Sequence, residues 1–193
     1  MKKITLLVTG ILFFTICFSQ NDSLKNKPKM LFRPYIENGV FFFQNDILKD
    51  NYSTKSLYYW GFGLQIGHTE SNKIVPFAQL SLSDFKTSKM TSENLIADST
   101  ISIKQFNFGV IIPIKRIDNY IFTTKLSYSH ALIKESFFKI DGKANGFQIG
   151  LGIERVMYKH TRIYFDLSYN FQKTKMAEFN DFDMTKLSIG FVI

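Results

Sequence analysis

Large apolar residues alternate with small or polar residues along 145–154, which reads NGFQIGLGIE. The apolar positions run from Phe147 to Ile153 at every second residue, and Gly146 to Glu154 fill the other parity. Successive side chains of a β-strand point to opposite faces of the sheet. The pattern therefore predicts a strand with one bulky apolar face and one small or polar face.

The same alternation recurs in seven other segments and is weakest at 31–44, where the run FFF blurs the two parities. The eight expected strands are 31–44, 58–67, 73–83, 101–112, 120–132, 145–154, 163–172 and 186–193. The links between them are long and short in strict turn, which is typical of an up-and-down barrel. We expect the long links, mainly 84–99, 133–144 and 174–184, to be exposed, mobile loops.

The glycines indicate which face of these strands lies inside. Eight of them fall on the polar face: Gly39, Gly61, Gly63, Gly67, Gly109, Gly150, Gly152 and Gly190. Glycine in a strand marks a bend or crowding, and the concave face of a barrel is the crowded one. Eight strands enclose room for side chains of modest size, so the bulky apolar residues must point outward. Because water would not tolerate such a belt, we predict an all-β fold, an eight-stranded antiparallel up-and-down transmembrane β-barrel.

The first residues have the pattern of a secretory signal peptide. Lys2 and Lys3 precede an apolar run that is too short for a membrane-spanning helix, and we expect cleavage after Ser19. The alternative, lipid attachment at Cys17, is disfavoured because Ile16 stands where a small residue is needed. The expected layout is a signal peptide at 1–19, a short periplasmic segment at 20–30 and the barrel domain at 31–193.

With this pattern the chain resembles the bacterial outer-membrane β-barrel protein family, in its small OmpA/OmpX-like eight-stranded form. The resemblance covers the whole mature chain and includes a final strand, KLSIGFVI, that runs to the last residue. Many such barrels end in Phe, whereas this chain ends in Ile193 with Phe191 on the same face. The resemblance implies the outer membrane, insertion by the barrel-assembly machinery, contact with outer-membrane lipid, and no peptidoglycan-binding domain. It implies no single activity.

Charge and candidate chemistry change this picture little. The formal net charge of +8 is scattered along the chain, and two of the positive charges belong to the signal peptide, so we expect no nucleic-acid partner. His130 has serines nearby, but Ser129 is adjacent in a strand and must face the opposite way. GFGLQIG does not leave a strand to open a helix, as a dinucleotide loop does. We therefore expect no catalytic residue, no cofactor and no metal site.

The inward parity carries three bases and three acids, and we expect them to form a paired network that plugs the lumen. The six residues are Arg33, Glu37, Lys125, Glu154, Asp166 and Lys186, with Lys186 placed between Glu37 and Asp166. Outward aromatic residues should form girdles at the two membrane interfaces. The girdle residues are Tyr58, Trp60, Tyr120, Tyr128, Tyr169 and Phe171.

These features favour an outer-membrane barrel with a structural or surface-interaction role, which meets a partner through its loops. Three alternatives stay open at this stage. They are a narrow porin-like channel for small solutes, an outer-membrane lipid-modifying enzyme, and a soluble barrel that carries lipid inside; the glycine positions count against the last.

Overall fold

The computed structural model describes residues 30–44, 56–68, 74–90, 96–136, 140–158, 161–176 and 179–193. Their strands are β1 (Met30–Phe43), β2 (Ser56–His68), β3 (Val75–Met90), β4 (Ile96–Ile117), β5 (Tyr120–Glu135), β6 (Ile140–Tyr158), β7 (Thr161–Met176), β8 (Phe179–Asp181) and β9 (Met184–Val192). The expected signal peptide at 1–19 lies outside the described residues. In the described ranges no helix is long and apolar enough to cross a membrane.

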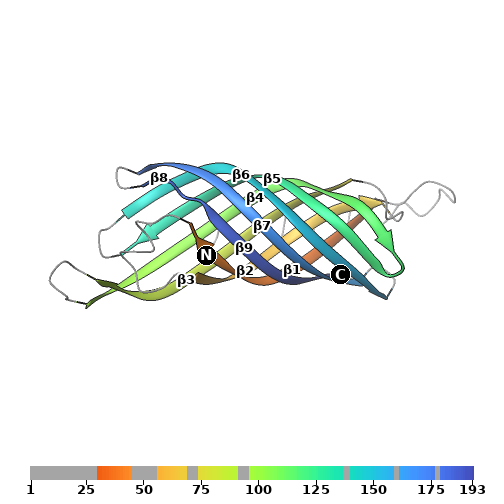
Figure 1. Ribbon diagram of the computed structural model, residues 1–193, viewed down its shortest axis with the longest axis horizontal. Coiled ribbons are helices and arrows are strands. Elements are labelled where there is room, and N and C mark those ends of the chain that lie inside the picture. Colours follow the sequence, from red (N-terminus) through yellow and green to blue (C-terminus); the bar gives the residue numbers. More distant parts are fainter. Residues whose placement is uncertain are drawn as a thin grey trace, which may run out of the picture.

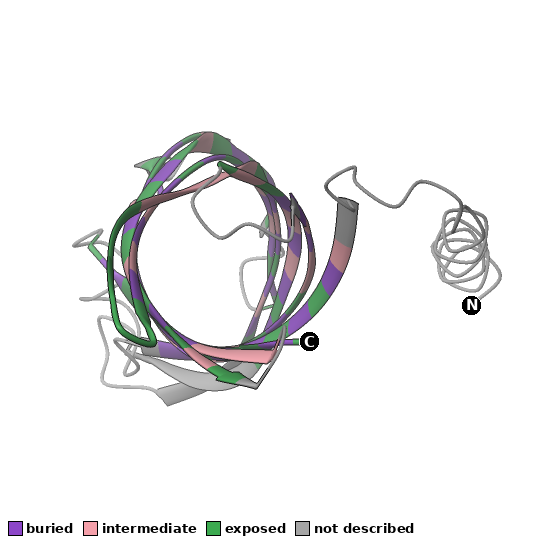
Figure 2. Cartoon of the chain, turned by 90° about the vertical axis from the view of Figure 1, so that its right-hand side faces the viewer, coloured by how far each residue is buried: buried purple, intermediate pink, exposed green. Residues whose placement is uncertain are grey.

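The strands close into one antiparallel barrel because β9 pairs with β1. This last ladder runs from Tyr35 opposite Val192 to Phe43 opposite Met184. Around the wall the order is β1, β2, β3, β4, β5, β6, β7 and β9, while the short β8 pairs with β7 alone. Figure 2, which looks along the barrel, shows the closed ring. The prediction of an eight-stranded antiparallel barrel is confirmed.

The strands are longer at the loop end than the sequence predicted. β3 and β4 stay paired as far as Met90 opposite Ile96, and β5 and β6 as far as Glu135 opposite Ile140. The third segment, 174–184, contains the end of β7, the whole of β8 and the start of β9. The expectation that 84–99, 133–144 and 174–184 are loops was therefore wrong for most of each segment. In the described residues the β2–β3 ladder ends at Leu82, so the β3–β4 hairpin projects beyond its neighbour as a two-stranded ribbon (Figure 1).

The opposite end of the barrel has tighter connections. β4 continues to Ile117, through most of the link expected at 113–118, and a two-residue turn at Asp118 and Asn119 leads into β5. Asp118 adopts a φ of 49°, a left-handed conformation that Asp tolerates better than most residues. We call this the turn end and the other the loop end.

The outer and inner faces of the barrel exchange character toward the loop end, as β5 shows. In the middle of β5, Lys125 and Ser127 are buried, while Tyr128 is 44% exposed. Toward the loop end of the same strand, Ile133 is buried and Lys134 is exposed. The barrel is therefore apolar outside and polar inside over its middle, but polar outside and apolar inside near the loop end.

Candidate functional site

The centre of the lumen is built around one buried carboxylate, Glu37 of β1. Lys186 of β9 places its Nζ 2.5 Å from Oε1 of Glu37, and neither side chain has any exposed area. Tyr59 donates a hydrogen bond to Oε1 at 3.0 Å, Tyr164 donates to Oε2 at 2.7 Å, and Gln79 also donates to Oε1. Buried charges persist when they are paired and hydrogen-bonded, and Glu37 meets both conditions. We call these five residues the central cluster.

Glycines make room for the two tyrosines of this cluster. A Cβ at Gly39 would lie 2.6 Å from Cε1 of Tyr59, and one at Gly190 would lie 2.5 Å from the hydroxyl of Tyr164. Both distances are too short for real atoms. The rings can lie along the inner wall and reach Glu37 only because Gly39, opposite Tyr59, and Gly190, opposite Tyr164, have no side chain. The inward glycines of the sequence pattern thus serve close approach.

Amide and hydroxyl groups form a second layer, which we call the amide layer. Gln105 donates from Nε2 to Ser129 Oγ at 2.6 Å and to Asn170 Oδ1 at 2.9 Å. Gln172 donates to the same Ser129 oxygen at 2.5 Å. All four residues are buried. The bond from Gln105 to Asn170 joins β4 to β7, which are not neighbours in the wall, so it spans the lumen between them.

An apolar cluster lies toward the loop end of the lumen and was not predicted. We call it the apolar cap; its members are Phe41, Phe43, Leu57, Tyr59, Ile101, Ile103, Ala131, Ile133, Ala144, Phe182 and Met184. The rings of Phe41 and Tyr59 stack with their centroids 4.3 Å apart. The signal was present in the sequence, since Phe41 and Phe43 share the parity of Glu37.

Toward the turn end, Glu154 is paired with a residue that the sequence analysis did not include. Arg162, in the second position of β7, places Nη1 2.7 Å from Oε2 of Glu154. Arg33 and Glu154 are both buried, as expected for inward positions. Arg162 was not predicted as a lumen residue because the seventh strand was expected to begin at Ile163, one residue after it.

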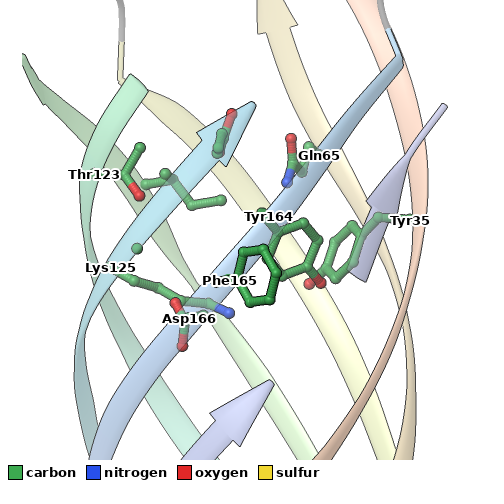
Figure 3. Close-up of a pocket in the computed structure, with 10 residues that line it drawn as sticks. Tyr35, Gln65, Thr123, Lys125, Tyr164, Phe165 and Asp166 are labelled. Atoms are coloured by element: carbon green, nitrogen blue, oxygen red, sulfur yellow. The ribbon is translucent and has the colours of Figure 1, made fainter. Parts of the chain in front are cut away.

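The two remaining predicted charges, Lys125 and Asp166, line a small chamber rather than join the central cluster (Figure 3). Among the described residues no hydrogen bond or ion pair joins Asp166 to Lys186, so Lys186 has one acidic partner where two were expected. Lys125 instead places Nζ 4.7 Å from the centre of the Phe77 ring. The six predicted lumen residues are thus all buried, but they divide among three places.

The chamber has space and polar groups for water. Its volume is about 20 Å³, measured as the space open to the centre of a water molecule, which is room for about one. The hydroxyl of Tyr35 and Oδ1 of Asp166 are buried without a hydrogen-bond partner among the described residues. The rings of Tyr35 and Tyr164 meet edge to face at 6.0 Å beside it (Figure 3). This chamber is too small for an organic solute.

Most of the predicted girdle residues are outward and exposed. Exposed fractions are 74% for Tyr58, 58% for Trp60, 42% for Tyr120, 44% for Tyr128 and 54% for Phe171. Tyr169 is half-buried, because its ring packs 4.5 Å from that of Phe171 and its hydroxyl donates to Asp183 at 3.3 Å.

His130 and Ser129 lie on opposite sides of the wall. The Ser129 hydroxyl accepts hydrogen bonds inside the lumen, in the amide layer. The ring of His130 is outside, with Nδ1 2.6 Å from Oδ1 of Asn145. A serine and a histidine in this arrangement cannot act as nucleophile and base. The described residues also contain no group of three His, Cys, Asp or Glu that could hold a metal ion.

Comparison with known proteins identifies the fold. No family model and no curated protein sequence matches the chain. Neisserial surface protein A superposes with a TM-score of 0.54 at 12% identity, over 84% of this chain and 96% of that one. OprG from Pseudomonas aeruginosa gives 0.49 at 10% identity, over 85% and 97%. Ail from Yersinia pestis gives 0.45 at 13% identity, over 83% and 96%. On the closed antiparallel wall and the match to the neisserial protein, this chain has the fold of the small eight-stranded outer-membrane β-barrels.

Proposed function

We propose that the protein is a closed outer-membrane barrel with a structural or surface-interaction role, exported by a cleaved signal peptide. One observation carries this proposal: side chains occupy the lumen at successive levels. The apolar cap, the amide layer and the central cluster follow one another from the loop end inward. These groups are buried, and they pack against or bond to residues on other strands. The lumen is therefore not a solute path, and the barrel serves as an anchor in the membrane.

Conductance measurements test the closed lumen. We expect the purified barrel, inserted into a planar bilayer, to give no stable ohmic current above that of the protein-free bilayer. Insertion is checked independently by the recovery of folded protein from the same bilayer lipid. Stable conductance steps would contradict the proposal and would favour the alternative, a narrow porin-like channel.

The surface role is assigned to the loop end, and most directly to the β3–β4 ribbon. Its two strands pair with each other beyond the point where the β2–β3 ladder ends, so in the described part of the barrel it projects furthest past a neighbour. Projecting strands offer backbone groups to a partner, which is a recurring mode of protein recognition. The partner would therefore be a protein or peptide met outside the cell.

An inserted epitope tests this orientation. A tag placed between Met90 and Ile96 should be detected by antibody on intact cells. The matched control carries the same tag at the turn after Asp118, where detection should require permeabilised cells. Detection of the second tag and not the first on intact cells would show that the barrel has the opposite orientation. It would reject the surface role of the ribbon.

A further inference from the structure

The outer face of β4 to β7 carries a row of aromatic residues that are neighbours across the sheet. Phe108 is opposite Tyr128, Tyr128 is opposite Phe147, and Phe147 is opposite Phe171. We call these four residues the aromatic row; their exposed fractions are 57%, 44%, 68% and 54%. Aromatic rings are favoured where lipid meets water, so this row marks the membrane boundary on this side of the barrel.

Outward residues that are opposite one another on neighbouring strands form a row, and consecutive rows are two residues apart on each strand. Two rows nearer the loop end than the aromatic row, the same face carries two lysines. Lys104 of β4 is opposite Leu132 of β5, and Leu132 is opposite Lys143 of β6. Both lysines are exposed, and Leu132 is half-buried between them. Two strand spacings separate the backbones of the lysines, which is about 10 Å. Their flexible ammonium groups can therefore reach one phosphate that lies over Leu132. We call these three residues the lysine row.

On β5 and β6 the intervening row carries neutral polar groups, while it ends in the half-buried Phe106 on β4 and the exposed Lys173 on β7. His130 is opposite Asn145, and Oδ1 of Asn145 is 2.6 Å from Nδ1 of His130. The hydroxyl of Tyr128 donates to the same oxygen at 2.9 Å. Both contacts use Oδ1, so Nδ2 of Asn145 remains as a donor toward the outside among the described residues. Along β6, the outward residues thus change from Phe147 to Asn145 to Lys143, from apolar to hydrogen-bonding to cationic, in the order of a lipid from chain to headgroup.

Among the described residues, the two lysines have no acidic partner within their own row. Lys134, one row further out, is already paired with Asp141 at 3.3 Å. Lys104 is opposite Leu82 and Leu132, and Lys143 is opposite Leu132, so these cross-strand partners are apolar. Asp84 of β3 is exposed two residues beyond Leu82 toward the loop end, and no ion pair joins it to Lys104 among the described residues. Both lysines of the row are therefore available to an external anion.

We propose that the lysine row and the aromatic row form a binding site for a phosphate-bearing lipid of the outer leaflet. The phosphate lies between Lys104 and Lys143, Asn145 donates to the headgroup, and the acyl chains lie along the aromatic row. A soluble anion would account for the lysines and leave the adjoining apolar surface without a role. The site rests on the orientation in the proposed function, with the loop end outside the cell.

The experiment is a titration of the purified full-length mature barrel, in neutral detergent, with diphosphoryl lipid A, followed by native mass spectrometry. A lysine near an anionic lipid surface strengthens binding by about fivefold, so the Lys104→Gln/Lys143→Gln variant should bind about 30-fold more weakly. Binding to the wild type should also fall as salt rises, because screening weakens attraction between exposed charges. Phosphatidylcholine should bind both proteins equally.

Two matched variants remove a lysine elsewhere. Lys134→Gln removes a lysine that is already paired, and Lys115→Gln removes an exposed lysine near the turn end. Both should retain wild-type affinity. Equal binding by the double variant and the wild type, or equal loss in the two controls, would overturn the site. Displacement by 10 mM inorganic phosphate would overturn its lipid character. The epitope experiment is independent of these outcomes, so failure of the site and failure of the proposed orientation are distinguishable.

Discussion

At the residue scale, the central cluster depends on charge compensation. Glu37 receives hydrogen bonds from two tyrosines and a glutamine, but Lys186 alone supplies a positive charge within ion-pair distance. Removal of one member of a buried ion pair costs more than removal of both, because the remaining charge has lost its partner and is still out of water.

Lys186→Met should therefore lower the free energy of unfolding by about 3–5 kcal/mol. The double variant Glu37→Gln/Lys186→Met should recover most of this loss, because a neutral amide replaces the stranded carboxylate. Urea unfolding in lipid vesicles, followed by tryptophan fluorescence of Trp60, measures both. An unchanged midpoint for Lys186→Met would show that the pair contributes nothing to stability.

A second residue-scale prediction concerns the space beside Tyr35. A Cβ at Gly63 would collide with the Tyr35 ring, and the three nearest atoms all belong to that side chain. Gly63→Ala should destabilise the barrel by about 1–3 kcal/mol through overpacking. In a Tyr35→Leu background the same change should cost much less. Additive effects of the two substitutions would mean that Gly63 is required for another reason.

At the element scale, much of the wall was predictable and the reversal along the strands was not. The parity of residues such as Glu37, Lys125 and Asp166 was enough to place them inside, since a period of two leaves no other choice. The apolar cap was not predicted, because the whole length of the outer face was expected to contact lipid. Where a strand leaves the bilayer the outer solvent becomes water, and the same parity changes from polar to apolar.

Partners within the lumen were harder to predict than the inward direction. Lys186 is opposite Phe41 in the β1–β9 ladder, so its side chain reaches four residues along β1 to Glu37. Depth counted from strand ends misses such reach, because strands in a barrel are staggered along the axis. Asp166 is opposite Ser188, only two residues from Lys186, so register alone does not separate them; the direction in which the Lys186 side chain extends, toward Glu37, decides its partner.

The reversal predicts that the same substitution to lysine has unequal costs at two positions of β6. Leu151, 63% exposed, lies in the apolar part of the outer face, whereas Asn145 lies two residues beyond Phe147 toward the loop end. Leu151→Lys should cost about 2–4 kcal/mol, and Asn145→Lys about 0–1 kcal/mol, because the penalty falls from the bilayer midplane to its surface. Equal costs in vesicle unfolding would argue against the boundary at the aromatic row.

At the scale of the whole molecule, closure leaves no unpaired edge in the wall. β1 is paired on both sides, with β2 and β9, and β7 is paired with β6 and β9. A sheet closed in this way satisfies its backbone groups without water, which is what a lipid environment demands.

The folded barrel should consequently resist sodium dodecyl sulfate at room temperature and unfold in it on boiling. We expect a different gel mobility for heated and unheated samples, and recovery with the outer-membrane fraction after lysis. Urea-denatured protein that has not been refolded into lipid serves as the control and should migrate alike in both samples. Recovery in the soluble periplasmic fraction would contradict the membrane assignment.

The exchange of inner and outer character also fixes how deep the molecule sits. If the barrel sank by one row, about 7 Å along a strand, Lys104 and Lys143 would approach hydrocarbon. If it rose by one row, the rings of Phe108 and Phe147 would enter water. Either displacement raises the free energy of the protein in the membrane, whereas a bilayer can thin or thicken at a cost of a fraction of a kcal/mol per Å. The barrel therefore holds its level and the surrounding leaflet adjusts its thickness to it.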